Sequence, residues 1–276
     1  MNYALIKRYC DGSATLAWLT LGEVGVWIIV MVLTLLGKMA HFYVPIAEWL
    51  TLPSYFPLFL TRPWTLLTYM AVHFDVLHML FNVLWLYWFG RILLNTLSDR
   101  HLLLAFVGGG LVGGMLFLAS AALGYGSGWL CGCSAAVISV MCVAAIRLPD
   151  HRLNLFLIGG VKLKWVAVVC CLLTFVGGGG NQAAHIGGLI WGVAVGLMLR
   201  EGIDPSKWIP SIAIKKPKSP ASRRPDVMVR VLKQRQTDMD RLDSLLDKIK
   251  LSGYESLSKK ERKELNELSQ KLSNKK

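Results

Sequence analysis

Of the polar side chains that lie within apolar segments of the sequence, where uncompensated burial is costly, four are of types that could do chemistry together. His78 and Asn82 are four residues apart in HFDVLHMLFNVLWLYWFG, so they share one face of a helix. Ser134 begins the apolar run after WLCGC, and His185 lies near the start of NQAAHIGGLIWGVAVG. A serine needs a base to lose its proton, and histidine is the usual one. The resulting oxyanion needs donors such as a backbone N–H, an amide or an imidazole. The four side chains therefore suit nucleophilic catalysis.

The elements that must position these side chains are membrane spans. The chain of 276 residues is 54% hydrophobic and only 17% charged, which is too apolar for a soluble globular protein. A bilayer needs about 20 apolar residues per helix. The sequence offers six candidate spans, at about 16–37, 76–95, 102–123, 134–148, 164–177 and 182–199. The fourth and fifth are short, which is tolerated when neighbouring helices shield them. The predicted fold class is all-α: a polytopic membrane bundle of six transmembrane helices with a small cytoplasmic helical tail.

Loop charges orient the predicted bundle. Lys and Arg flank the first span, the second and fourth connections and the start of the tail, whereas 124–133 and 177–181 carry neither. By the positive-inside rule, both termini are cytoplasmic. The polar groups of spans two, four and six then all lie toward the outer ends of their helices. The orientation depends only on the Lys and Arg residues of the loops, so this placement of the polar groups is an independent observation.

The long outer loop, residues 38–75, is itself apolar and aromatic. Its four prolines argue against one continuous spanning helix. We expect the loop to lie in the membrane interface, with its aromatic residues near headgroup level: Trp49, Tyr55, Phe56, Phe59 and Trp64. Near its end, His73 is expected to hold the loop by hydrogen bonds rather than to take part in catalysis.

Each candidate residue also has an ordinary structural interpretation. Ser134 could cap a helix, and His185 could bond a backbone carbonyl. His78 and Asn82 could join neighbouring helices. These alternatives are open for each residue taken alone. Together they do not explain why the polar groups of spans two, four and six all lie toward the outer ends of their helices. A repeat of small residues at Ala184, Gly188, Gly192 and Gly196 would let the fourth span approach the sixth closely enough for Ser134 to reach His185.

In their order along the chain and their predicted depth in the membrane, these motifs resemble those of the rhomboid intramembrane serine proteases. The resemblance covers most of residues 60–200, through RPWTLLTYMAVHFDVLHMLFNVLWLYWFG, GCSA and AHIGG. It implies that Ser134 is the nucleophile and His185 the general base of a dyad without a third acid. It further implies that His78 and Asn82, with the Ser134 backbone N–H, bind the oxyanion. The expected function is an intramembrane serine endopeptidase that cleaves transmembrane segments of membrane proteins near the outer face.

The sequence departs from the family pattern at three places. The glycine that usually follows the serine is Ala135, and the position where tyrosine often packs on the base is Ile138. The common Trp-Arg pair of the first loop reads Trp64-Thr65, with Arg62 nearby. These departures bear on activity more than on fold. A catalytically inactive relative that binds or escorts membrane clients is therefore the alternative function.

The chain divides into an apolar body and a basic tail. Residues 1–200 are the predicted membrane domain, 201–225 a basic linker rich in Pro, Ser and Lys, and 226–276 a cytoplasmic helical hairpin or a partly disordered tail. In the hairpin, apolar residues from Leu242 to Ile249 share one helix face, and Ser258 and Glu261 fit a capping box.

We expect neither a metal nor another cofactor. Cys131 and Cys133 form C-x-C, and no second cysteine pair completes a zinc site. The expected partners are transmembrane protein substrates and membrane lipid. Nucleic-acid binding is disfavoured because 11 acidic residues interleave with the 20 basic ones from Arg200 onward. Family resemblance suggests the bacterial cytoplasmic (inner) membrane, and the oligomeric state is left open.

Overall fold

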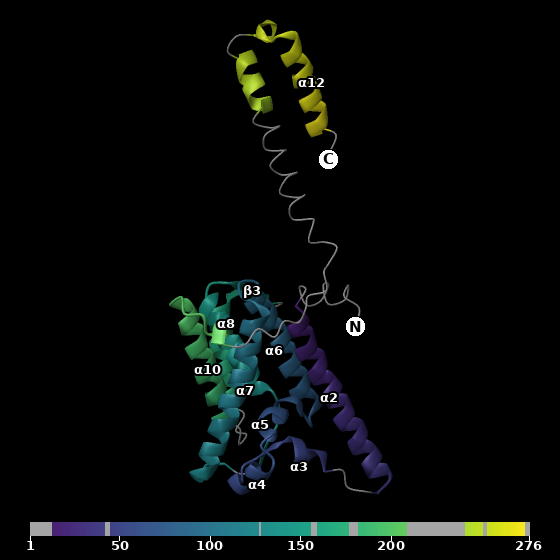
Figure 1. Ribbon diagram of the computed structural model, residues 1–276, viewed down its shortest axis with the longest axis vertical. Helices are drawn as coiled ribbons and strands as arrows, with labels where there is room; N and C mark the ends of the chain where they lie inside the picture. The colour runs from purple at the N-terminus through teal and green to yellow at the C-terminus, as the bar shows by residue number, and fades with distance from the viewer. Residues whose placement is uncertain are drawn as a thin grey trace. The chain divides into compact units, whose positions relative to one another are not determined.

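The four candidate residues lie on three helices of an apolar bundle: α6 (Val76–Leu94), α8 (Ser134–Arg147) and α10 (Gln182–Arg200) (Figure 1). The computed structural model describes residues 13–41, 45–126, 128–155, 159–176, 182–208, 241–250 and 253–273. The chain separates into two compact units, Met1–Pro210 and Ser211–Lys276. Within the described part of the first unit, the apolar helices are α2 (Ala14–Met39), α6 (Val76–Leu94), α7 (Asp99–Ala122), α8 (Ser134–Arg147), α9 (Leu163–Val176) and α10 (Gln182–Arg200). Each predicted span coincides with one of them.

Four of the described helices, α2, α6, α7 and α10, are long and apolar enough to cross a membrane. The other two, α8 and α9, have 14 residues each, or about 21 Å at 1.5 Å per residue. That is shorter than the roughly 30 Å of a bilayer core. Neighbouring helices compensate for the short length of α8. It packs against α6, α7 and α10 and is buried continuously from Ala135 to Ala145. It is the central helix of the bundle.

The connections contain short helices and two small antiparallel ribbons. Between α2 and α6, the loop forms α3 (Ile46–Leu50), β1 (Leu52–Pro53), α4 (Phe56–Thr61), α5 (Thr65–Thr68) and η1 (Tyr69–Ala71). No continuous helix forms across its described residues, as the prolines predict. Strand β1 pairs with β2 (Trp129–Leu130), just before α8. Strands β3 (Arg152–Leu155) and β4 (Gly159–Lys162) form a hairpin between α8 and α9. The all-α expectation omitted both ribbons, which add to a bundle that is otherwise helical.

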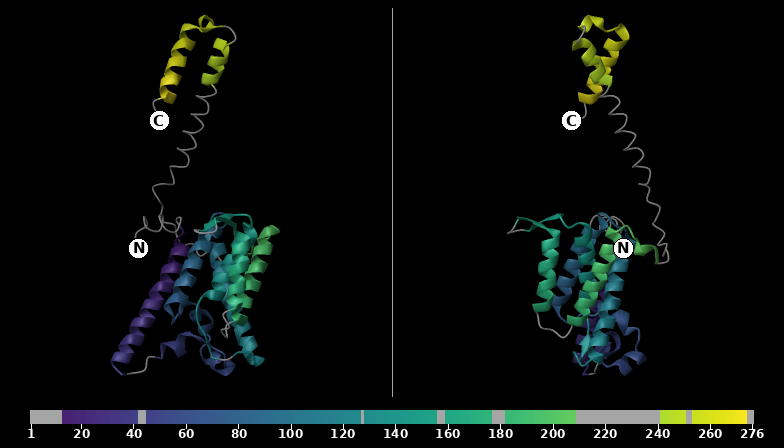
Figure 2. Two further views of the ribbon diagram at one scale, coloured as in Figure 1. Left: turned by 180° about the vertical axis from the view of Figure 1, so that it is seen from behind. Right: turned by 90° about the vertical axis from the view of Figure 1, so that its left-hand side faces the viewer.

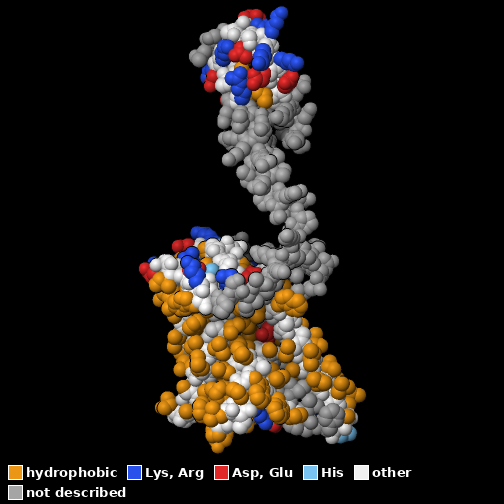
Figure 3. Space-filling model, viewed as in Figure 1, with side chains coloured by type: hydrophobic (Ala, Val, Ile, Leu, Met, Phe, Trp, Pro, Cys, Tyr) orange, Lys and Arg blue, Asp and Glu red, His pale blue; other side chains and the backbone are white. Residues whose placement is uncertain are grey.

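The surface of this unit is apolar along its helices. In Figure 3, hydrophobic side chains cover the body, and charged side chains gather at the end where β3 lies. Helix α2 runs along one edge of the bundle in Figures 1 and 2, and it exposes large apolar side chains, including Trp18, Ile29 and Leu35. Exposed apolar surface of this extent is stable only against lipid or a partner protein. The unit is a helical bundle of an integral membrane protein.

The described residues of the second unit form two helices. Residues 241–250 are helical, η4 (Tyr254–Ser256) follows, and α12 (Lys259–Ser273) completes the pair. The Ser258 N–H donates to Glu261 Oε2 (2.8 Å), and the Glu261 N–H donates to Ser258 Oγ (3.2 Å), which is the predicted capping box. Lys248 and Glu261 join the two helices at 2.9 Å. The linker from residue 209 and the segment 226–240 lie outside the described residues.

Glu261 makes the stability of this pair dependent on pH. Its hydrogen bonds with Lys248, and then with Ser258, lower the pKa of the carboxyl from 4.5 to about 2. A depressed carboxyl pKa stabilises the folded form above pH 4.5, and this contribution disappears as the pH falls from 4.5 toward 2. In the full chain with ¹³C-labelled glutamate, we expect the Glu261 carboxyl to titrate near pH 2 by NMR. Lys248→Gln should move that midpoint toward 4.5, whereas Lys250→Gln, which leaves the pair intact, should not. An unchanged midpoint in Lys248→Gln would contradict the assignment.

Candidate active site

Ser134 occupies the first position of α8, and its hydroxyl does not act as a cap. The N-cap residue is Cys133, which makes no side-chain capping bond. The Ser134 Oγ instead lies 2.8 Å from His185 Nε2. His185 is in the first turn of α10. The structure therefore brings together the two residues that the sequence paired, although 51 positions separate them.

Small residues on α10 make this contact possible. A side chain at Gly188 would overlap the backbone of Ala135, and one at Gly192 would lie 2.6 Å from the Ser139 carbonyl oxygen. Farther along, Gly196 lies against the side chain of Ile146 rather than against backbone. Helices α8 and α10 therefore approach each other backbone to backbone along the predicted seam. This approach sets the distance between the serine and the histidine.

His78 and Asn82 lie on α6, on the other side of α8. Asp75 caps this helix by accepting the His78 N–H at 2.7 Å. The Asn82 Nδ2 donates to the His78 carbonyl oxygen at 2.9 Å, which uses one of its two amide hydrogens. The His78 ring packs against Gly132, since a Cβ there would lie 2.8 Å from its Cε1. The two side chains thus flank the segment that leads to the serine.

A cavity of about 460 Å³ opens beside the serine. Asn82 and Ser134 are the polar side chains in its lining, which is otherwise apolar and sulfur-containing: Phe81, Trp85, Val137, Ile138, Met141, Cys170 and Leu173. An apolar pocket with a few convergent polar groups is typical of a binding or active site. It offers space next to the hydroxyl for an apolar segment of another molecule.

The loop before α6 holds the segment that presents the serine. Leu52 lies opposite Leu130 in the β1–β2 ribbon, and the Gly132 N–H donates to the Tyr69 carbonyl oxygen at 2.9 Å. Tyr69 is fully buried, and its hydroxyl donates to the Gly110 carbonyl oxygen at 2.7 Å. The loop is thereby tied to α7 and to the residues that precede α8. Sequence analysis did not identify Tyr69, because nothing local distinguishes it from other aromatic residues of the loop.

His73 contributes to the same framework. Its Nε2 accepts the backbone N–H of Cys133 at 3.3 Å, which confirms the prediction that it holds the loop by hydrogen bonding. Burial lowers the pKa of His73 to about 4, and the charge of His78 acts in the same direction. The imidazole is therefore neutral at physiological pH. Cys133, which the sequence analysis named only as part of the C-x-C pair, is hydrogen-bonded to His73 through its backbone N–H.

The structure accommodates each of the three departures from the family pattern. Ala135 has a helical backbone without positive φ, so this position does not require glycine. Ile138 lines the cavity. Arg62 lies over the Trp49 ring at 4.6 Å, and Trp64 stacks on that same ring with 5.9 Å between centroids. Arginine and tryptophan thus meet in space although the adjacent pair is missing from the sequence.

Comparison with known proteins agrees with this architecture. Residues 60–202 match the family described as Rhomboid domain, which covers the described core of the bundle from α4 to the end of α10. Residues 230–271 match a family of unknown function, DUF6576, and this range includes the helical residues 241–250 and most of α12. No curated protein matches the chain.

Proposed function

Because the chain belongs to the rhomboid family of intramembrane proteases, we propose that it is an intramembrane serine endopeptidase with a Ser134–His185 dyad. The observation that carries the proposal is the 2.8 Å separation of Ser134 Oγ and His185 Nε2. This distance is within the range that proton transfer between nucleophile and base requires. For the transfer, Nε2 must be the unprotonated nitrogen, so Nδ1 carries the hydrogen of the neutral ring.

In the acylation step, Ser134 Oγ attacks the scissile carbonyl carbon while its proton moves to His185 Nε2. The carbonyl oxygen becomes an oxyanion. We expect its donors to be the Ser134 backbone N–H, which lies in the first turn of α8 and has no intrahelical acceptor, and the Asn82 side chain, which lines the cavity together with Ser134. The third expected donor is the His78 side chain, which packs against Gly132 and is not among the residues that line the cavity. The protonated His185 then gives its proton to the leaving amine, and Ser134 is left as an ester.

In the deacylation step, water attacks the ester carbonyl carbon and gives a proton to His185 Nε2. His185 returns this proton to Ser134 Oγ as the bond between Oγ and the acyl carbon breaks and the carboxylic acid product leaves. The substrates are transmembrane segments of other membrane proteins, since the cavity beside Ser134 is lined mainly by apolar side chains of α6, α8 and α9. A helical segment must unwind first, because its carbonyl groups are already hydrogen-bonded within the helix. Glycine and other small or helix-breaking residues near the cleavage site should therefore favour a substrate.

The proposed setting is the bacterial cytoplasmic (inner) membrane, with six helices crossing it and both termini in the cytoplasm. Charged side chains gather at the β3 end of the membrane unit, which supports placing that end at the cytoplasmic face (Figure 3). The second unit, with its helix pair, then belongs to the cytoplasm. Cleavage takes place toward the opposite, outer face.

The test uses purified full-length protein reconstituted into liposomes with a single-span reporter. One reporter carries a Gly-Ala pair near the outer end of its span, and a matched reporter carries Leu-Leu there. We expect cleavage of the first reporter within its span, mapped by mass spectrometry, and little cleavage of the second. Recovery of both reporters intact, but bound to the protein, would contradict the proposal and support the inactive, client-binding alternative.

Gly132 provides a further prediction, because its backbone and its surroundings both require glycine. Its φ is +98°, and an added Cβ would lie 2.8 Å from the His78 ring. Gly128 has the same φ but no neighbouring atom within 4 Å, so it is a matched control. Both Ala variants carry the backbone strain of about 1–2 kcal/mol. Only Gly132→Ala should also displace His78 or the serine segment and lower kcat/KM by about 10²-fold. Equal activity losses in the two variants would contradict this role of the His78 contact.

A further inference from the structure

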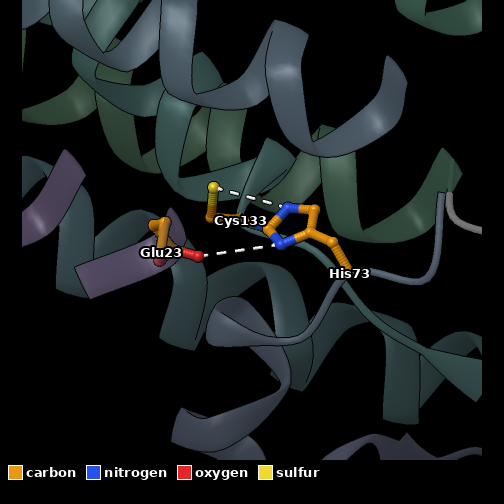
Figure 4. Close-up of side chains that lie close together, drawn as sticks. All are labelled: Glu23, His73 and Cys133. Atoms are coloured by element: carbon orange, nitrogen blue, oxygen red, sulfur yellow. Dashed lines mark hydrogen bonds and ion pairs between the residues drawn. The ribbon is translucent and has the colours of Figure 1, made fainter. Parts of the chain in front are cut away.

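A buried cluster beside the active site has no part in the mechanism above. Glu23, His73 and Cys133 come from α2, from the loop before α6 and from the residue preceding α8 (Figure 4). Their exposed fractions are 6%, 0% and 0%. A carboxyl group, an imidazole and a thiol so close together in an apolar bundle need a physical reason, because buried polar groups are costly without partners.

The carboxyl group and the thiol each lie close to one of the two ring nitrogens of His73. The His73 Nδ1 lies 3.7 Å from Glu23 Oε2, and the His73 Nε2 lies 3.8 Å from Cys133 Sγ. One ligand atom from each residue lies within 4.8 Å of the other two. The backbone N–H of Cys133 donates to Nε2, so in the neutral ring Nδ1 carries the hydrogen and faces the carboxyl group. A metal ion bound at Nδ1 would move this hydrogen to Nε2 and replace the bond from Cys133.

The hydrogen bonding of this cluster is incomplete. Within the part of the chain that the structure describes, neither Glu23 Oε2 nor His73 Nδ1 has a hydrogen-bond partner. Their separation of 3.7 Å is too long for a hydrogen bond between them. Two fully buried polar atoms that face each other at this distance leave room for an ion that both can ligate.

The protonation chemistry suits a metal ion. The imidazole offers a lone pair on Nδ1 for coordination once the ring hydrogen lies on Nε2. A coordinated metal deprotonates a thiol such as that of Cys133 outright. One carboxylate and one thiolate then balance a divalent cation, and the buried site is electrically neutral.

We propose that Glu23, His73 and Cys133 bind one divalent metal ion of the zinc class. Thiolate, imidazole and carboxylate are the zinc ligands of proteins, whereas calcium and magnesium prefer oxygen ligands alone. Zinc bond lengths place tetrahedral ligands about 3.3–3.8 Å apart. The Glu23–His73 distance of 3.7 Å already fits, and the other atoms need only small rotations from within 4.8 Å. Three protein ligands leave the fourth position to water.

Such an ion would connect α2 to the active-site segment. Glu23 is on α2, and Cys133 immediately precedes Ser134. Helix α2 packs mainly against α6 and lies at the edge of the bundle (Figures 1 and 2). Metal binding would therefore fix the first helix to the backbone that presents the nucleophile. It should raise the thermal unfolding midpoint of the protein, because the ligands are assembled only in the folded state.

The experiment titrates tag-free, full-length protein in detergent with Co²⁺ alone, after treatment with a chelator and its removal. Wild type should show a thiolate-to-cobalt charge-transfer band at one Co²⁺ per chain, and Zn²⁺ should displace it. Cys133→Ser should lose the band, whereas Cys131→Ser, two residues away and outside the cluster, should keep it. Glu23→Gln should weaken Co²⁺ binding by at least about 10-fold.

Two results would overturn the proposal. One is folded wild-type protein that shows no cobalt–thiolate band, a result that needs no variant. The other is a band of equal intensity in Cys133→Ser, which would place the thiolate elsewhere in the chain. Proteolysis is not a readout in this experiment, so failure of the metal site and failure of the proposed protease activity are distinguishable.

Discussion

Ser134→Ala and His185→Ala should each lower the rate of reporter cleavage by about 10⁴-fold or more. The first change removes the attacking oxygen, and the second removes the base 2.8 Å from it. Because the two residues act as one unit, the double variant should be no slower than either single variant. Initial rates in liposomes measure all three. Ser120→Ala is the control, since this serine bonds the Phe117 carbonyl in α7 and should retain wild-type activity.

If the rate loss of the double variant equals the product of the losses of the two single variants, Ser134 and His185 do not act in a shared mechanism. Retention of more than a tenth of wild-type activity in Ser134→Ala would assign nucleophilic attack to another group. Thermal unfolding of each variant in detergent separates these outcomes from misfolding. Neither change should cost much stability, because the pair is a polar contact at the edge of a cavity rather than part of the packed core.

The second large effect concerns the contact between α8 and α10. At Gly188, an added methyl group has no space, because the backbone of Ala135 occupies that position. Backbone atoms cannot rotate away as a side chain can, so Gly188→Ala must push the two helices apart. Overpacking of this kind costs about 1–3 kcal/mol of stability. His185 lies one turn from Gly188, so a shift of about 1 Å should also lower kcat/KM by about 10²-fold.

Gly22→Ala is the matched control for this prediction. No atom lies within 4 Å of a Cβ at Gly22, so the methyl group is accommodated. It should leave activity unchanged and stabilise α2 by up to about 1 kcal/mol, because alanine favours a helix over glycine. Unfolding midpoints and kcat/KM of the two variants measure the difference. Equal midpoints for Gly188→Ala and wild type would show that the helices are not in backbone contact.

The features that could be predicted from the sequence are those with local signals. The apolar run from Ser134 predicted a helix over 134–148, and α8 is Ser134–Arg147. The repeat of small residues on α10 predicted close approach to α8, and Gly188 and Gly192 face it. Both predictions depend on spacing within one helix, which the sequence displays directly.

Apart from the pairing of Ser134 with His185, contacts between distant residues had no such signal. The β1–β2 ribbon joins Leu52 to Leu130, and each strand is only two residues long, too short for an alternating pattern. Glu23 and His73 were each noticeable as polar residues in apolar surroundings, but their meeting with Cys133 depends on how α2 packs against the bundle. The intramembrane position of Glu23 was the one available indication of this cluster.

Ala135, which replaces the usual glycine of the family, is another feature whose effect could not be predicted from the sequence. Whether alanine can replace glycine there depends on the backbone φ, which one sequence does not reveal. The helical conformation of Ala135 places no demand for glycine on this position. Alanine is therefore compatible with the active-site geometry. By contrast, Gly132 has φ +98° and does require glycine.

The central claim is that His185 activates Ser134 as a nucleophile. The most direct measurement is labelling of the full-length protein in detergent with a fluorophosphonate, followed by peptide mass spectrometry. A fluorophosphonate reacts with a serine oxygen only when that oxygen is activated by a base. We predict one adduct, on Ser134, in wild type, and none in His185→Ala. An adduct on Ser134 that persists in His185→Ala, or a folded wild type without an adduct on Ser134, would contradict the claim.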